Sequence, residues 1–168
     1  MTKRHSQHLG NRSDSPTHAG PVRRDAGPVS PSAMHCTALI VDDSSAARSV
    51  MREIVREAGL RDDRIYEAAN GQEALALFEE VWIDLVLLDI NMPVMNGEVF
   101  ARTLRAREDL DDVRMLVVTA EHSPFRHARL RQLGVDWILT KPFYADHLRD
   151  AIRICLPGAE SVGRSSAA

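Results

Sequence analysis

Carboxylate, hydroxyl and ammonium side chains stand directly after short apolar runs at four places in this sequence. Asp42 and Asp43 follow the first run, Asp89 follows a second, and Thr119 and Lys141 stand at the ends of two later runs. Two like charges about 4 Å apart repel by roughly 4 kcal/mol at an effective dielectric constant near 20, so clustered carboxylates require a proton or a cation among them. Mg²⁺, which prefers oxygen ligands, meets that requirement.

These residue types together are suited to phosphoryl transfer. A metal ion and an ammonium group neutralise phosphoryl oxygens while an aspartate acts as the nucleophile. Asp89 is the best candidate nucleophile because it ends the most apolar run, and Lys141 is the only lysine after Lys3 in a chain that otherwise uses arginine. A lone lysine suits a site that needs a compact point charge. Gly97, after Pro93, is expected to supply either a positive φ or a close backbone approach.

Continuous apolar runs predict strands that are covered on both faces, as in a parallel sheet. The clear runs are Ala38–Val41, Leu85–Leu88 and Met115–Val118, and the weaker ones are Ile65–Tyr66 and Trp137–Leu139. Ligands of such sheets bind beyond the carboxyl ends of the strands, near a switch in strand order. The polar residues that follow the strands are therefore expected to meet at one rim.

Amphipathic patterns alternate with the apolar runs and predict five helices. The expected apolar faces are Ala47, Val50, Met51, Ile54, Val55 and Ala58; Ala74, Leu77, Phe78 and Val81; Phe100, Thr103 and Leu104; and Leu148, Ala151, Ile152 and Cys155. Asn70 with Glu73 predicts a capping box, and Ser123-Pro124 predicts the start of a fourth helix whose apolar face is poorly defined. Five strand–helix repeats predict an α/β domain with a doubly wound, five-stranded parallel sheet and right-handed crossovers.

Length and composition bound the class of protein. The chain has 168 residues, enough for one ordinary domain, and its 44% hydrophobic content supports a real core. A formal net charge of -3 argues against a protein that coats nucleic acid or an anionic membrane, and no apolar run approaches the roughly 18 residues of a membrane span. Cys36 and Cys155 form no CxxC motif, so we expect two buried thiols in a reducing, cytoplasmic protein.

The two ends of the chain differ from the middle. The first 33 residues hold four of the eight prolines and almost no large apolar side chain, which predicts a disordered leader. This leader carries five basic and two acidic residues, whereas residues 34–156 carry 15 basic and 21 acidic residues. We expect a leader over residues 1–34, a folded domain over residues 36–157 and a flexible tail over residues 158–168.

Five ordered blocks resemble the receiver domain of two-component response regulators, and in particular its single-domain, chemotaxis-type members. The blocks are LIVDDS at 39–44, LVLLDINMPVMNG at 85–97, LVVTAE at 116–121, the region of Gly134, and LTKPF at 139–143. The resemblance covers about residues 37–156. It implies a flavodoxin-like receiver fold with strand order 2-1-3-4-5, which agrees with the pattern above.

The resemblance also implies a metal site and a phosphorylation site. Asp89 is similar to the phosphoacceptor aspartate of the family. Asp42 and Asp43 resemble its acidic pair, with Asp43 binding Mg²⁺ directly and Asp42 acting mainly through water. Asn91 resembles the position whose backbone carbonyl ligates the metal, and Asp89 itself is the fourth expected ligand.

Two further positions match the family's signalling residues. Thr119 resembles the hydroxyl that moves toward the phosphoryl group, and Lys141 resembles the lysine that pairs with phosphoryl oxygens, followed by Pro142 after a cis peptide bond. One position departs from the pattern: the family usually has Tyr or Phe three residues before the lysine, and this chain has Ile138. The neighbouring Trp137 is expected on the opposite face of its strand.

The implied function is that of a phosphoacceptor signalling protein rather than an enzyme acting on a separate substrate. A sensor histidine kinase is the expected phosphodonor, an unknown protein is the expected target, Mg²⁺ is the expected cofactor, and the chain is expected to be a monomer that binds neither nucleic acid nor membrane. Asn91 and Glu121 are expected to orient a water for fairly fast self-dephosphorylation, and the fourth helix is expected to move most.

Alternative functions remain open at this point. A receiver used only for docking, without phosphorylation, is one alternative, and Ile138 supports it. A phosphorelay intermediate to a histidine phosphotransfer protein is another, in which Arg48, Met51, Arg52 and Val55 would meet a helical partner. An aspartyl-nucleophile phosphatase would require DxDxT after the first strand, and a flavin-binding module would require a Ser/Thr/Gly phosphate loop there; this chain has Asp42-Asp43-Ser44-Ser45.

Overall fold

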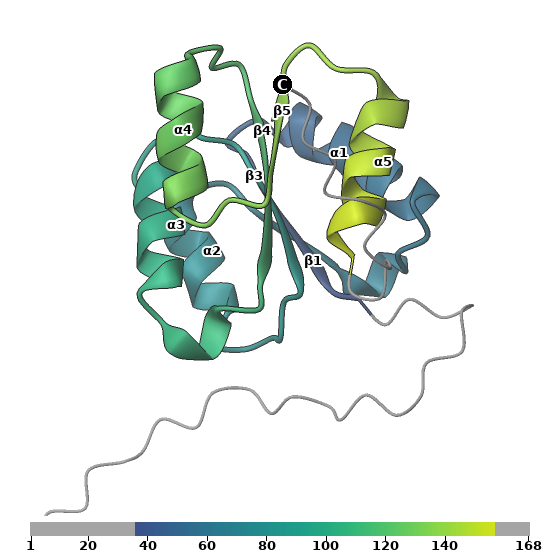
Figure 1. The fold of residues 1–168 in the computed structure, drawn as a ribbon. Helices are drawn as coiled ribbons and strands as arrows, with labels where there is room; N and C mark the ends of the chain where they lie inside the picture. The colour runs from purple at the N-terminus through teal and green to yellow at the C-terminus, as the bar shows by residue number, and fades with distance from the viewer. Residues whose placement is uncertain (1–35, 157–168) are drawn as a thin grey trace, which may run out of the picture.

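Five short strands form one parallel sheet, described here from a computed structural model of residues 36–156 (Figure 1). The strands are β1 (Ala38–Val41), β2 (Ile65–Ala68), β3 (Leu85–Leu88), β4 (Arg114–Thr119) and β5 (Trp137–Thr140). Their order is β2-β1-β3-β4-β5, and every neighbouring pair is parallel. The predicted fold class and strand order are confirmed, with β3 at the centre of the sheet.

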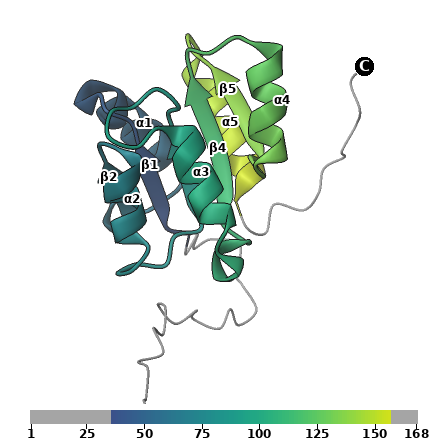
Figure 2. The ribbon, with the colours of Figure 1, turned by 90° about the vertical axis from the view of Figure 1, so that its left-hand side faces the viewer.

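Five α-helices cover the two faces of this sheet. They are α1 (Ser45–Glu57), α2 (Gly71–Leu77), α3 (Gly97–Arg105), α4 (Pro124–Gln132) and α5 (Ala145–Cys155), with short 3₁₀ turns η1 (Asp62–Arg64) and η2 (Glu108–Leu110). Helices α1 and α5 lie on one face, and α2, α3 and α4 lie on the other, as the two perpendicular views show (Figures 1 and 2).

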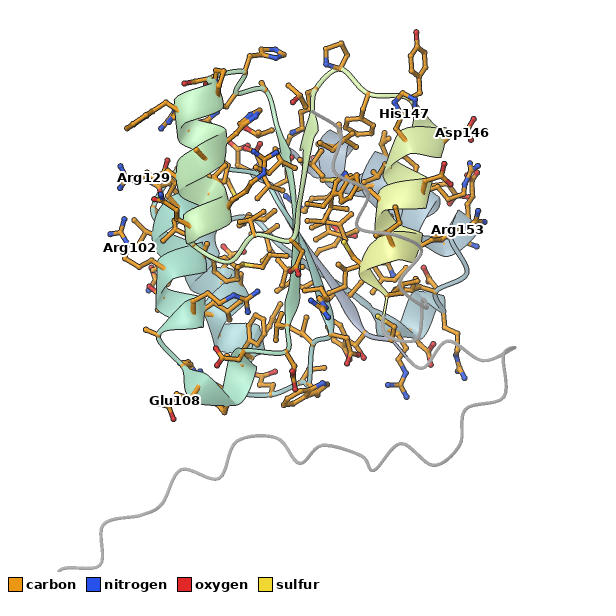
Figure 3. All side chains as sticks on the ribbon, in the orientation of Figure 1. Arg102, Glu108, Arg129, Asp146, His147 and Arg153 are labelled. Atoms are coloured by element: carbon orange, nitrogen blue, oxygen red, sulfur yellow. The ribbon has the colours of Figure 1, made fainter. Side chains whose placement is uncertain are left out.

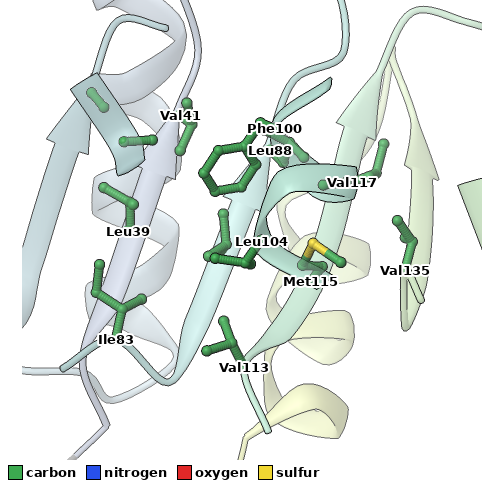
Figure 4. Close-up of a cluster of buried hydrophobic side chains, with 14 of the residues drawn as sticks. Leu39, Val41, Ile83, Leu88, Phe100, Leu104, Val113, Met115, Val117 and Val135 are labelled. Atoms are coloured by element: carbon green, nitrogen blue, oxygen red, sulfur yellow. The ribbon is translucent and has the colours of Figure 1, made fainter. Parts of the chain in front are cut away.

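Alternate residues of each strand feed two separate cores. In β1, Leu39 and Val41 join the cluster under α2, α3 and α4, whereas Ala38 and Ile40 join the cluster under α1 and α5. Figure 4 shows the first cluster, in which Phe100 lies against the central strands. Full burial of a large apolar side chain contributes about 1.5–3 kcal/mol, so a strand buried on both faces must be apolar throughout.

The helical patterns were predicted correctly except at three positions. Thr103 was assigned to the apolar face of the third helix, but it is exposed in α3. Val50 was assigned to the apolar face of the first helix, but its side chain is 57% exposed. The buried stripe of α1 consists of Met51, Ile54 and Val55, and Val50 lies just beyond its edge, about 40° of rotation from Ile54. Val81 was assigned to the second helix, but α2 ends at Leu77, and Val81 lies in the following turn.

The predicted helix starts have the expected capping geometry. Asn70 Oδ1 accepts hydrogen bonds from the backbone N–H groups of Gln72 and Glu73, both at 3.0 Å, and the Glu73 carboxylate reaches back to the Ala69 N–H at 2.9 Å. Ser123 Oγ accepts from Arg126 N at 3.5 Å, a longer and weaker cap. Asn70 and Ser123 thus cap two helices in the same way, one with strong hydrogen bonds and one with a weak one, so their contributions to stability can be compared.

Both cysteines are free thiols within the core, as predicted. Burial, with the nearby Asp84 carboxylate adding to it, raises the pKa of the Cys36 thiol to about 12. Burial likewise raises the pKa of Cys155 to about 11. Both groups are therefore protonated at neutral pH and behave as small apolar side chains.

The predicted leader and tail lie outside the described residues. Over residues 36–156, no helix is both long enough and apolar enough to cross a membrane.

Replacing the stronger cap should destabilise the fold more than replacing the weaker one. Asn70→Ala removes two backbone acceptors and should lower the free energy of unfolding by about 1–2 kcal/mol, whereas Ser123→Ala should cost less than about half of that. Urea unfolding with a common m-value measures both changes. Equal losses in the two variants would contradict the assignment of the caps.

Candidate functional site

The carboxyl ends of four neighbouring strands bring the expected site residues to one rim of the sheet. Val41 and Val117 both pair with Leu88, so the residues that follow β1 and end β4 flank the residue that follows β3. Asp42, Asp89 and Thr119 are all buried at this rim. Lys141 follows β5, and its backbone N–H donates to the Thr119 carbonyl at 2.7 Å.

Lys141 joins the two buried carboxylates. Its Nζ atom lies 2.9 Å from Asp42 Oδ2 and 3.4 Å from Asp89 Oδ1. The side chains of the two aspartates are only 2% and 8% exposed, whereas that of Lys141 is 30% exposed and reaches the pair from the solvent side. The Lys141–Pro142 peptide bond is cis, as the family resemblance implied.

Backbone N–H groups hold the remaining oxygen of each buried carboxylate. Ser44 N–H donates to Asp42 Oδ1 at 2.9 Å, and Asn91 N–H donates to Asp89 Oδ2 at 3.0 Å. Each aspartate thus has one oxygen on a backbone donor two residues later and the other directed at the same ammonium group. The rotamers of both carboxylates are fixed by this arrangement before any ligand binds.

The pKa values at this rim reflect burial and mutual attraction. Burial raises the pKa of Asp89 above its ordinary value; the Lys141 ammonium opposes this change, and the Asp42 charge adds to it. Burial acts to lower the pKa of Lys141, but the hydrogen bond to Asp42 and the charges of both aspartates outweigh it, so that the pKa lies above its ordinary value. The lysine is therefore charged across the physiological range.

Asp43 occupies a different position from the other two aspartates. It is exposed and lines a cavity of about 440 Å³ together with Asn91, Glu98 and Arg126. Lys141 is the cation that pairs with Asp42 and Asp89, and a metal ion shared by all three aspartates stays a prediction. Among residues 36–156, no group of three acidic, histidine or cysteine side chains forms a ready-made metal cage.

The donor set still fits Mg²⁺ rather than a softer metal. Mg²⁺ keeps several waters and binds proteins through one or two carboxylates, so it needs no complete cage. An exposed carboxylate at Asp43, the backbone of Asn91 and an open cavity supply oxygen ligands and room for those waters. The histidine and cysteine ligands that zinc prefers do not line this cavity.

Gly97 allows the backbone to pass close to the site residue Asp89. A Cβ atom at Gly97 would collide with the carbonyl oxygen of Asp89, which confirms the expected close approach. The alternative expectation of a positive φ at Gly97 is wrong, because the positive φ values among described glycines belong to Gly59 and Gly134. The loop instead has its left-handed residue at Val94, with φ 65°, a strained conformation for a β-branched side chain.

Thr119 and Glu121 are linked through the backbone after β4. The Glu121 N–H donates to Thr119 Oγ1 at 3.2 Å, and the Glu121 carboxylate accepts from Ser123 N–H and from the Arg126 guanidinium. The Arg126 hydrogen bond holds the pKa of Glu121 below its ordinary value. Both carboxylate oxygens are thus engaged, and the role of Glu121 in orienting a water stays a prediction.

Ile138 and Trp137 lie on opposite faces of β5, as strand alternation predicted. Ile138 is half-buried against the cluster under α3 and α4, and Trp137 is 43% exposed.

Sequence reasoning missed Glu98 and Arg126, which border the cavity. A signal was present, since α4 has a poor apolar stripe but several arginines, and such a helix requires charged partners.

Comparison with known proteins finds a matching family model and several similar proteins. Residues 38–153 match the family model described as "Response regulator receiver domain". The chain is 33% identical over 114 residues to chemotaxis protein CheY-3 of Vibrio cholerae, covering 68% of this chain and 86% of that protein. It is 31% identical over 119 residues to sporulation initiation phosphotransferase F of Bacillus subtilis, covering 71% and 92% of the two chains.

A solved structure supports the same relationship. The fold is similar to that of chemotaxis response regulator CheY4 of Vibrio cholerae, with a TM-score of 0.66 and 30% sequence identity. That similarity covers 72% of this chain and 98% of the solved chain. The match therefore spans nearly the whole of the solved protein.

Replacing the buried Asp89 by its uncharged isostere should stabilise the metal-free protein. A raised pKa means that folding favours the protonated form, so the ionised carboxylate costs stability at neutral pH and this cost fades as the pH falls through the raised pKa. Asp89→Asn should raise the free energy of unfolding at pH 7 by about 1 kcal/mol, with a smaller gain at acidic pH.

The matched control is Asp43→Asn, which removes an exposed carboxylate at the same rim and should change stability little. Unfolding in chelator-containing buffer at several pH values measures both variants. A destabilised Asp89→Asn protein would show that the charge of Asp89 contributes to the fold.

Proposed function

Because the chain belongs to the response regulator receiver domain family, we propose that it signals by accepting a phosphoryl group from a histidine kinase on Asp89. The observation that carries the proposal is the fixed position of the Asp89 carboxylate, with one oxygen on a backbone N–H and the other facing the Lys141 ammonium. Membership of the family makes the chain a two-component signalling protein; the residue-level roles are the proposal.

The reaction is an exchange of one phosphorus bond for another. A carboxylate oxygen of Asp89 attacks the phosphorus of a phosphohistidine in line, forming an acyl phosphate. The phosphorus–nitrogen bond breaks, and the imidazole leaves with the electron pair and takes up a proton. Lys141 neutralises a phosphoryl oxygen, since its ammonium already lies within 3.4 Å of Asp89 Oδ1.

The residues that would hold Mg²⁺ are Asp43, Asp42, Asp89 and the backbone carbonyl of Asn91. When bound, the ion supplies positive charge that stabilises the phosphoryl oxygens during transfer. Asp43 is the side chain best placed for direct contact because it is exposed at the cavity. Asp42, buried and already paired with Lys141, is suited to act through water.

Phosphorylation gives the rim new charge and new acceptor atoms. The acyl phosphate carries acceptor oxygens that the Thr119 hydroxyl and the Lys141 ammonium can engage. These contacts exist only in the phosphorylated state, so they bias the protein toward a second arrangement of the loop and helix that follow β4. A partner protein then recognises that arrangement.

A relay to a second helical partner is less well supported by the first helix. Met51 and Val55 are buried in the core, so only Arg48 and Arg52 of the predicted docking stripe reach the surface. Both arginines are engaged by carboxylates: Arg48 pairs with Glu67, and Arg52 pairs with Glu67 and Asp62. We therefore favour direct signalling to a protein target over a phosphorelay step, although one relative is named a phosphotransferase.

Incubation with a small acyl-phosphate donor and Mg²⁺ tests the proposal. Intact mass should rise by one phosphoryl group, and Asp89→Asn should abolish the increase because the nucleophile is gone. Asp63→Asn, at an exposed aspartate remote from the rim, should leave it unchanged. An unmodified wild-type protein, or an Asp89→Asn protein that is modified equally, would refute the assignment.

Mg²⁺ should also stabilise the folded protein in the absence of any donor. At a free concentration of 100 times the dissociation constant, binding to the folded state alone adds about 2.7 kcal/mol to the free energy of unfolding. Asp43→Asn should lose most of this gain while keeping its metal-free stability. Glu80→Gln, a control at an exposed acid away from the rim, should keep the full gain. A thermal unfolding titration measures all three proteins.

A further inference from the structure

Helix α4 packs against the domain with very few apolar contacts. Of its nine residues, only Leu130 is buried, and Phe125 is 78% exposed. Helix α3, of the same length, buries Phe100 and Leu104 among others. Helices in proteins derive most of their stability from packing of an apolar face, so α4 requires another means of attachment.

Ion pairs to a half-buried carboxylate of α3 supply that attachment. Glu98 is 14% exposed, and its two oxygens lie 3.6 Å from Arg126 Nε and 3.4 Å from Arg129 Nε. Figure 3 shows the Arg129 side chain on the outer side of α4. The Arg126 and Arg129 side chains are 44% and 50% exposed, so salt can screen these pairs. Two guanidinium groups of α4 thus share one acid of α3.

Glu121 ties the first turn of the same helix to the end of β4. Its carboxylate accepts from Arg126 Nη1 at 2.5 Å and from Ser123 N–H at 2.9 Å. The Nε2 atom of His127 lies 2.7 Å from the Glu121 carbonyl, to which it donates. Three residues at the start of α4 are therefore bound to one glutamate.

Glu121 is also bound to the hydroxyl that the proposed function assigns to signalling. Its N–H donates to Thr119 Oγ1, and the half-buried Ile138 on the adjacent strand has no polar group that could take part. Arg126, which bonds to Glu121, lines the same cavity as Asp43 and Asn91. Hydrogen bonds thus connect Thr119 at the rim to Glu121, and Glu121 to Arg126 in α4.

We propose that the cluster of Glu98, Arg126, Arg129 and Glu121 is an electrostatic latch that holds α4 in place and connects it to Thr119. The regulatory part of this inference rests on the proposed function. When Thr119 turns toward a phosphoryl group, the Glu121 N–H loses its acceptor, and the new negative charge beside the cavity competes with Glu121 for Arg126. The latch then opens, and α4 becomes free to adopt a second position.

Amide hydrogen exchange of the unphosphorylated chain tests the holding role. Arg126→Gln and Glu98→Gln should each make the amides of residues 126–132 exchange about three- to tenfold faster, because local opening of α4 becomes easier. Glu57→Gln removes the Arg149 pair between α1 and α5 and is the matched control, which should leave α4 exchange unchanged. Exchange in Arg126→Gln and Glu98→Gln as slow as in wild type would overturn the proposal.

Salt separates an electrostatic latch from an ordinary packing contact. Raising the ionic strength from about 0.1 M to about 1 M shortens the screening length from roughly 10 Å to 3 Å. Amide exchange of α4 should quicken in wild type and quicken less in Arg126→Gln, which has lost the Arg126 pairs but keeps the pair between Arg129 and Glu98. An equal salt response in both proteins would contradict the latch.

The connection to Thr119 is tested by Thr119→Val, which keeps the buried shape but removes the acceptor. Amide exchange of α4 should quicken in this variant without any phosphoryl donor, and a wild-type rate would refute the connection.

In wild type, an acyl-phosphate donor and Mg²⁺ should quicken α4 amide exchange toward the Arg126→Gln rate. Phosphorylation without that change would refute the regulatory role. If wild type takes up no phosphoryl group, the proposed function fails, while the comparisons of unphosphorylated variants still decide whether the latch holds α4.

Discussion

The contact on which this molecule depends is the one between the Lys141 ammonium and two buried carboxylates. Asp42 and Asp89 lie almost entirely out of water, and each would repel the other strongly without a cation between them. Lys141 provides that cation from the end of β5, and backbone N–H groups fix the outer oxygens. The two carboxylates are therefore held in fixed positions by hydrogen bonds and by one ammonium group.

The sheet makes this contact possible because its strands are buried on both faces. Two separate apolar cores, one under α1 and α5 and one under α2, α3 and α4, fix the positions of β1, β3 and β4. The rim residues stand at the ends of these strands, so their backbone positions are fixed as well. Helix α4 is the exception, since it buries one residue and is otherwise attached by ion pairs. In the proposed function, this rigid rim next to a helix attached mainly by ion pairs is the physical basis for converting a local charge change into movement.

Much of this could be predicted from the sequence, because the signals were local or periodic. Continuous apolar runs identified the strands, the capping residues Asn70 and Ser123 identified two helix starts, and the lone Lys141 identified the rim cation. The remainder depended on three-dimensional relations. The spacing of apolar residues in the first helix did not show whether Val50, beside the buried stripe, is itself buried. The ion pair between Glu98 and Arg126 joins two different helices, and no local pattern predicts such a pair. The exposure of Asp43 beside the buried Asp42 likewise depends on the packing around the rim, which the run of two aspartates does not specify.

The most direct test of the central claim is to locate the phosphoryl group chemically. Borohydride reduces an acyl phosphate to an alcohol, so the phosphorylated chain should yield a peptide with homoserine at position 89 and with every other aspartate intact. Homoserine at Asp42 or Asp43, or a phosphoryl group retained on a residue other than an aspartate, would contradict the account of how this rim works.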